Sequence, residues 1–243
     1  MKVPNIGILV CDEISAPLGA QHGQYGDMFK RLLAASGTRF ELHFYRVYAG
    51  EFPDDVDSCD AYIISGSRHS VYEPLPWIAR LATFLRALHA ARRRTVGICF
   101  GHQLIGQTFG GRTEKATQGW GLGRHTAEVL ETTPWMQPPA PRYSLFAVHQ
   151  DQVTTLPPGA QRLATSSHCA NAMFVLDDVM LGVQAHPEFT ADYARAITEN
   201  KQGVAPAAVI EQALPGFAEQ VDAELLAHWI VTFLGGKVLA PQK

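Results

Sequence analysis

Long apolar runs are absent from this sequence, because no stretch approaches the roughly 20 residues that a membrane-spanning helix needs. An excess of one charge is also absent: 20 Lys and Arg face 23 Asp and Glu, which leaves a formal net charge of −3. Nothing in that balance indicates nucleic acid or an anionic membrane as a partner. We therefore expect neither.

Cysteine is scarce, and its spacing argues against two common uses. The opening residues MKVPNIGILVCDEI form too short an apolar run, and are too acidic at their end, for a secretion signal. This start, together with widely spaced cysteines, predicts reduced thiols in a cytoplasmic protein. No C-x-x-C pair, and hence no zinc or redox motif, is found among Cys11, Cys59, Cys99 and Cys169.

The chain does have enough apolar residues for a substantial core, 47% of 243. We expect one domain spanning 1–243. Its first half alternates strand-like and helix-like segments, which predicts an α/β fold with a mostly parallel sheet and helices on both faces. Residues 112–184 instead carry short strands and turns, a small antiparallel β excursion. The predicted strands and helices of the first half are 6–10, 28–35, 40–47, 61–64, 77–90, 95–98 and 103–109.

Cys99 stands in the frame Gly97-Ile98-Cys99-Phe100-Gly101, between a predicted strand and a predicted helix. Flanking glycines allow a sharp turn and a close approach of neighbouring backbone. The same geometry presents the serine of G-x-S-x-G hydrolases. The position therefore favours a nucleophile, although a lone apolar cysteine is by itself more often a core residue.

Two further segments follow strand ends, where ligands of open α/β sheets gather. One is the turn at Gly66 and Ser67, and the other contains His186 and Glu188. In an extended segment the side chains at i and i+2 point the same way, so Glu188 is placed to orient His186 as a base for a thiol. The backbone N–H groups of Phe100 and Ser67 are candidate oxyanion donors. Each feature alone has a purely structural explanation, but the three together predict a site.

These motifs resemble the class I (triad) glutamine amidotransferases, and most closely stand-alone GMP-synthase-like members. The resemblance implies a flavodoxin-like sheet, Cys99 as nucleophile, His186 as base and Glu188 as its orienting residue. It also implies that Gly66, Gln103 and the loop from His149 to Asp151 hold the substrate, and that no metal or organic cofactor is needed. The matching segments are 97–103, 149–153, 182–188 and the glycine-rich stretch 119–123.

The sequence departs from the family pattern in two places. The usual Gly-Gly-Pro oxyanion turn is replaced by Gly66-Ser67-Arg68, which still keeps a donor at Ser67. No synthetase domain follows His186-Pro187-Glu188, so we expect ammonia to pass to a separate synthetase subunit.

The function that these residues predict is attack of Cys99 on the γ-carboxamide of glutamine, with a γ-glutamyl thioester as intermediate. The substrate is thus a small molecule, either glutamine or a γ-glutamyl compound. Two alternatives stay open. One is a γ-glutamyl peptidase or hydrolase with the same fold and triad, and the other is a non-catalytic regulatory module with a relic triad.

Overall fold

A parallel sheet forms the first part of the fold in the computed structural model, which describes residues 3–235. Its strands are short, and β1, β3, β4 and β11 are almost wholly buried, as expected where helices cover both faces. The order β2-β1-β3-β4-β11 places β4 and β11 side by side, in the register Ile98 to Val183. These strands are β1 (Asn5–Val10), β2 (Glu41–Arg46), β3 (Ala61–Ile64), β4 (Thr95–Ile98) and β11 (Met180–Val183).

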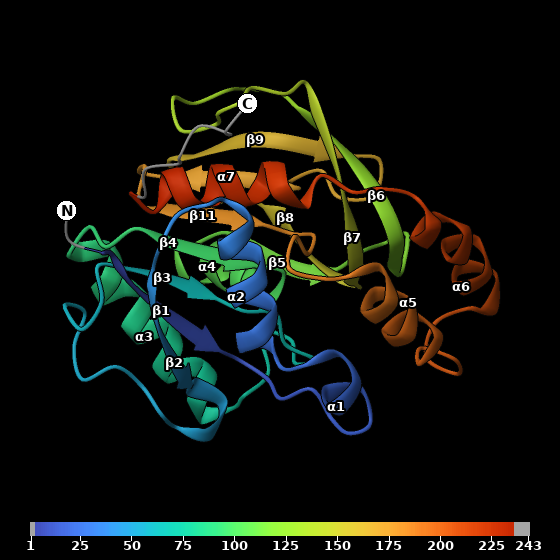
Figure 1. Cartoon of the computed structure of the whole chain (residues 1–243), viewed down its shortest axis with the longest axis horizontal. Coiled ribbons are helices and arrows are strands. Elements are labelled where there is room, and N and C mark those ends of the chain that lie inside the picture. Colours follow the sequence, from blue (N-terminus) through green and yellow to red (C-terminus); the bar gives the residue numbers. More distant parts are fainter. Residues whose placement is uncertain (1–2, 236–243) are drawn as a thin grey trace.

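Antiparallel strands continue the same sheet beyond β11 in the order β10-β9-β6-β7 (Figure 1). Within residues 3–235 the sheet therefore has nine strands. A separate antiparallel pair joins β5 (Arg112–Lys115) to β8 (Asp151–Thr155). The antiparallel strands of the main sheet are β6 (Gly121–Val129), β7 (Arg142–His149), β9 (Ala160–Ser166) and β10 (Met173–Leu176).

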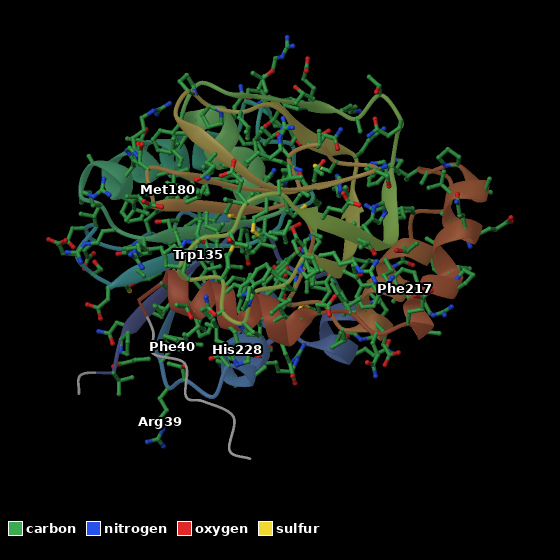
Figure 2. All side chains as sticks on the ribbon, turned by 90° about the horizontal axis from the view of Figure 1, so that it is seen from above. Arg39, Phe40, Trp135, Met180, Phe217 and His228 are labelled. Atoms are coloured by element: carbon green, nitrogen blue, oxygen red, sulfur yellow. The ribbon has the colours of Figure 1, made fainter. Side chains whose placement is uncertain are left out.

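Helices cover the parallel strands on both faces. Ile6 and Ile8 of β1 pack into one apolar cluster with α2 and α7, whereas Leu9 packs on the other face with α3 and α4. Side chains fill the space between sheet and helices (Figure 2), and Trp135 meets Phe233 of α7 edge-on with ring centroids 5.3 Å apart. These helices are α2 (Tyr25–Ala35), α3 (Pro76–Ala90), α4 (Phe100–Thr108) and α7 (Ala223–Phe233).

Local sequence explains where two of these helices begin. Gln24 and Asp27 form a capping box at the start of α2, and Pro76 occupies the first turn of α3, where its missing N–H costs little. The remaining helical segments are α1 (Leu18–His22), α5 (Ala191–Glu199), α6 (Ala207–Ala213) and two 3₁₀ turns, Val47–Ala49 and Leu214–Ala218.

The prediction of an α/β fold with a large, mostly parallel sheet is confirmed. The sequence did not predict α1, β5 or β9. None of the helices in residues 3–235 is both long enough and apolar enough to cross a membrane.

Candidate active site

Cys99 occupies the turn between β4 and α4 with a positive φ of +51°, which is uncommon for a residue other than glycine. Its two flanking glycines are required by close backbone contacts. A Cβ at position 97 would lie 2.3 Å from the carbonyl carbon of Gly101, and a Cβ at 101 would lie 2.6 Å from the backbone oxygen of Ile64. The chain can therefore turn tightly enough to leave Cys99 at the rim of the sheet, which is the geometry that the glycine spacing predicted.

His186 follows β11, the strand that pairs with β4, so the sheet brings it to Cys99. Its backbone N–H donates to the oxygen of Phe146 over 2.8 Å, and its ring stacks on Phe189 with centroids 3.8 Å apart. Nδ1 of the ring lies 2.7 Å from Oε1 of Glu188, and both side chains are buried. The hydrogen bond expected between positions 186 and 188 is present.

The electrostatics around His186 favour a charged imidazole. Burial alone would lower its pKa, but the negative charge of Glu188 and the interaction with Cys99 outweigh burial and raise the pKa to about 10. At neutral pH the ring therefore holds a proton in this arrangement. A protonated imidazole beside a thiol can stabilise the thiolate and later deliver a proton to a departing amine.

The loop after β3 carries Gly66 and Ser67 against this pair. A Cβ at position 66 would stand 2.9 Å from Cε1 of His186, so glycine is needed there for the ring to keep its place. The Ser67 hydroxyl donates to the oxygen of Cys11 over 3.0 Å and accepts from the N–H of His69. Within residues 3–235 the N–H of Ser67 has no acceptor, and Phe100 lies in the first helical turn, where N–H groups lack intrahelical partners.

Gln103, His149 and Asp151 come together on the other side of Cys99. The Gln103 amide nitrogen donates to the backbone oxygen of Asp151 over 2.7 Å, and Nδ1 of His149 lies 3.0 Å from the same oxygen. Oδ1 of Asp151 accepts from the hydroxyl of Tyr72 over 3.2 Å. These contacts brace the loop between β7 and β8, so two of the side chains expected to hold substrate are engaged with the loop's own backbone.

Cys99 lies between two hollows that share part of their walls. The first has a volume of about 410 Å³ and includes His186, and the second, of about 350 Å³, includes Gln103, His149 and Asp151. Both are lined by Ser67, Arg68, Cys99, Val148 and Lys201.

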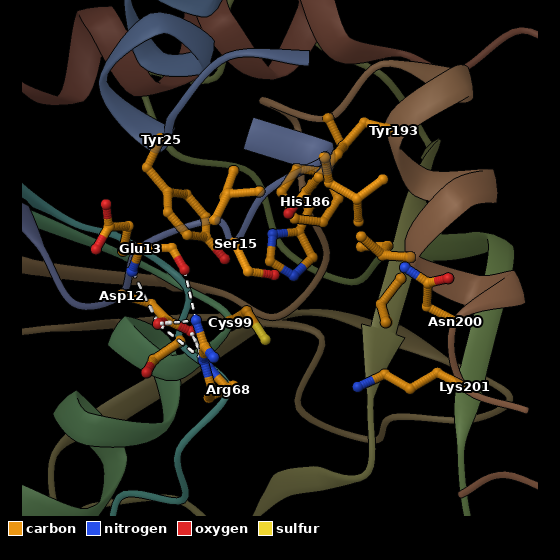
Figure 3. A pocket seen from close by; sticks show the side chains of 16 residues that line it. Asp12, Glu13, Ser15, Tyr25, Arg68, Cys99, His186, Tyr193, Asn200 and Lys201 are labelled. Atoms are coloured by element: carbon orange, nitrogen blue, oxygen red, sulfur yellow. Dashed lines mark hydrogen bonds and ion pairs between the residues drawn. The ribbon is translucent and has the colours of Figure 1, made fainter. Parts of the chain in front are cut away.

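Several polar residues of the first hollow were not found from the sequence (Figure 3). Asp12 follows β1 and holds Arg68 through an ion pair of 2.8 Å, opposite Lys201, which enters from the end of α5. Asp12 could have been found, because it comes shortly after the carboxyl end of a parallel strand. Lys201 stands in a polar segment with no periodicity or motif, so its sequence carried no signal.

The remaining cysteines differ from Cys99 in their setting. Burial raises the pKa of each of these thiols, and for Cys169 the pKa rises to about 12. In the described part of the chain no group of three or more His, Cys, Asp or Glu side chains could hold a metal ion.

Comparison with known proteins gives a family. The model of the family "Glutamine amidotransferase class-I" matches residues 22–201. Gamma-glutamyl peptidase 3 of Arabidopsis thaliana is 31% identical over 180 residues, which cover 70% of this chain and 71% of the relative. One subunit of a glutamine-hydrolysing GMP synthase from Methanococcoides burtonii is 44% identical over 94 residues, covering 38% of this chain and 49% of the relative.

A solved structure of a glutamine amidotransferase from Methylobacillus flagellatus has the same fold, with a TM-score of 0.72 at 21% identity over 100% of this chain and 99% of the other. The names of the two relatives give different activities, that of a γ-glutamyl peptidase and that of a glutamine-hydrolysing GMP synthase. The family match itself spans residues 22–201, which is most of the chain. The chain belongs to the class I glutamine amidotransferase family.

Proposed function

We propose that this protein is a cysteine-dependent hydrolase of γ-glutamyl amide bonds. The observation that carries the proposal is the placement of Cys99 on a strained turn beside the buried, hydrogen-bonded pair of His186 and Glu188. A non-glycine residue held at a positive φ is uncommon and such residues cluster at functional sites, and a histidine with a raised pKa beside a thiol suits thiolate chemistry.

In the first half of the reaction Cys99 forms a thioester. Its sulfur attacks the amide carbon of the γ-glutamyl group, and the electrons of the C=O bond move onto oxygen. In this proposal the N–H groups of Phe100 and Ser67 stabilise that charge. When the C–N bond breaks, His186 gives its proton to the departing nitrogen, so ammonia or an amine leaves as a neutral molecule.

In the second half water replaces the amine. His186, now neutral and still hydrogen-bonded to Glu188 through Nδ1, accepts a proton from the water as its oxygen attacks the thioester carbon. The carbon–sulfur bond breaks, glutamate leaves and the thiolate–imidazolium pair is restored. Glu188 keeps the ring in one orientation throughout and does not itself need to change protonation state.

With glutamine as substrate the product besides glutamate is ammonia, which would pass to a separate synthetase subunit. The match to the glutamine-hydrolysing GMP synthase of Methanococcoides burtonii supports this version. A γ-glutamyl peptidase is the second candidate, supported by the relatives of that name and by the hollow that adjoins His186.

The test is release of glutamate by purified protein from glutamine and from γ-glutamylglycine, measured side by side. We expect activity on at least one substrate, loss of it in Cys99→Ala, and its retention in the matched control Cys11→Ala. Absence of glutamate release from both substrates, or a Cys99→Ala protein with normal turnover, would favour a non-catalytic module.

A further inference from the structure

The hollow beside His186 is much larger than ammonia requires. Its volume is about 410 Å³, whereas a cavity of roughly 15 Å³ holds a water-sized molecule. Volumes of this order are typical of sites for small organic ligands. The hollow can therefore hold a group of the substrate that is larger than ammonia.

In the proposed reaction, the direction of proton transfer indicates which part of the substrate occupies this hollow. His186 lines this hollow and does not line the second one. The departing nitrogen must be within reach of the group that protonates it, so the leaving group lies on the His186 side of Cys99. The γ-glutamyl part then lies on the opposite side, near Gln103 and the loop from His149 to Asp151.

Lys201 lies on the wall that this hollow shares with the second one, and it is the cation there that lacks an acidic partner. Its amino group lies 4.7 Å from the ring centroid of Trp120, which lines the second hollow, and no carboxylate in residues 3–235 forms an ion pair with it. Arg68, by contrast, is already paired with Asp12 and also donates to the backbone oxygen of Glu13. Burial, which disfavours the charged form, is the main cause that lowers the pKa of Lys201. A bound anion would stabilise the charged amino group and so offset the effect of burial.

Two tyrosines lie in the same wall. Tyr25 and Tyr193 are 7% and 4% exposed, and both line the hollow. Neither hydroxyl is among the fully buried polar atoms that lack a partner in residues 3–235, so both are open to the hollow and can bond a polar ligand there. The wall therefore offers one cation and two hydroxyls to a group that leaves from the His186 side.

We propose that the hollow binds the leaving group of a γ-glutamyl amino acid or peptide, and that Lys201 binds the carboxylate of that leaving group. This inference rests on the proposed function and names its substrate class. The amine that departs would be an α-amino acid or peptide whose carboxylate reaches across the hollow from the His186 side to Lys201 (Figure 3). Lys201 thus determines specificity and takes no part in bond breaking.

The test compares Lys201→Met with Lys201→Arg on two substrates that differ in one group. γ-Glutamylglycine carries a carboxylate on its leaving group, and γ-glutamylethylamide does not. For Lys201→Met we expect the kcat/KM ratio of the first substrate to the second to fall by about 10-fold to 100-fold, as is usual for loss of a charged hydrogen bond. The fall should lie mainly in KM, and Lys201→Arg should restore most of the ratio.

Each other result overturns the inference. Equal losses on both substrates would assign Lys201 to the γ-glutamyl part, and no loss on either would leave it without a role in binding. Wild-type protein that hydrolyses glutamine but not γ-glutamylglycine would refute the leaving-group site while leaving the proposed function intact. Wild-type protein inactive on all three compounds would instead refute the proposed function itself. A thermal melt of each variant checks that the fold is retained.

Discussion

Gly66 lies so close to the ring of His186 that a Cβ at position 66 would stand 2.9 Å from Cε1. The backbone of Gly66 does not have a positive φ, so alanine can adopt its conformation. The cost of Gly66→Ala should then fall on the position of the imidazole ring rather than on the turn. Catalytic groups displaced by about 1 Å can lose about 100-fold in rate.

We predict that Gly66→Ala lowers kcat by about 10-fold to 100-fold with only a small change in Tm. Glutamate release and a thermal melt measure the two quantities. A variant with wild-type kcat would mean that the ring moves freely, and one with a much lower Tm would mean that the loop and not the ring absorbs the added methyl group.

Selective alkylation should separate Cys99 from the other cysteines. Burial raises the pKa of Cys11, Cys59 and Cys169, which keeps them as unreactive thiols, whereas Cys99 lines two hollows beside a protonated imidazole. A glutamine-like alkylating agent at neutral pH should modify Cys99 alone, as peptide mass spectrometry would detect. Comparable labelling of a second cysteine in folded protein would remove the case for an activated thiol.

The ion pair of His186 and Glu188 predicts a pH dependence of stability. The pKa of His186 rises from 6.5 to about 10, so the folded protein holds a proton that the unfolded chain releases between those values. The stabilisation is fully present below pH 6.5 and is lost as pH rises towards 10, so the free energy of unfolding falls across this window.

Glu188→Gln removes the charge that raises the pKa and should flatten this part of the curve. Urea unfolding of wild type and variant at several pH values between 6.5 and 10 measures the difference, and groups that titrate in both proteins cancel. Parallel curves for the two proteins would show that Glu188 does not hold the proton on His186.

Removal of one backbone donor tests the oxyanion site. Ser67→Pro lacks the N–H that we assign to the developing charge, and should lower kcat by roughly 10²-fold to 10³-fold, with a smaller effect on KM. Ser67→Ala keeps the N–H but loses the hydroxyl contacts to Cys11 and His69, so it is the matched control and should lose less. A folded Ser67→Pro protein with full turnover would place the second donor elsewhere.

Sequence patterns predicted most of the parallel strands, because a strand that is buried on both faces is a short, uninterrupted apolar run such as 61–64. They did not predict β9, whose exposed Gln161 and Arg162 break the alternation, nor β5, where only Thr113 is buried. α1 has five residues and no buried side chain, so it leaves no apolar stripe.

The candidate site divides in the same way. Cys99, His186 and Glu188 stand in short motifs at strand ends, and their meeting follows from the pairing of β4 with β11. Tyr25 and Tyr193 reach the hollow only because α2 and α5 pack around it, and Lys201 reaches it from the turn that follows α5. The residues next to them in the sequence do not indicate this arrangement, so local sequence patterns could not have identified the three residues.

The pairing of β4 with β11 has a consequence for a chain that is still being made. Thr95 pairs with Met180, so the strand that carries the thiol leaves the ribosome well before the strand that carries the imidazole. At roughly 5–20 residues per second this interval lasts several seconds. During it the nascent chain has Cys99 but neither His186 nor Glu188. The proposed chemistry at Cys99 therefore awaits insertion of a late strand into the middle of the sheet, and we expect an unfinished chain to be inert towards γ-glutamyl compounds.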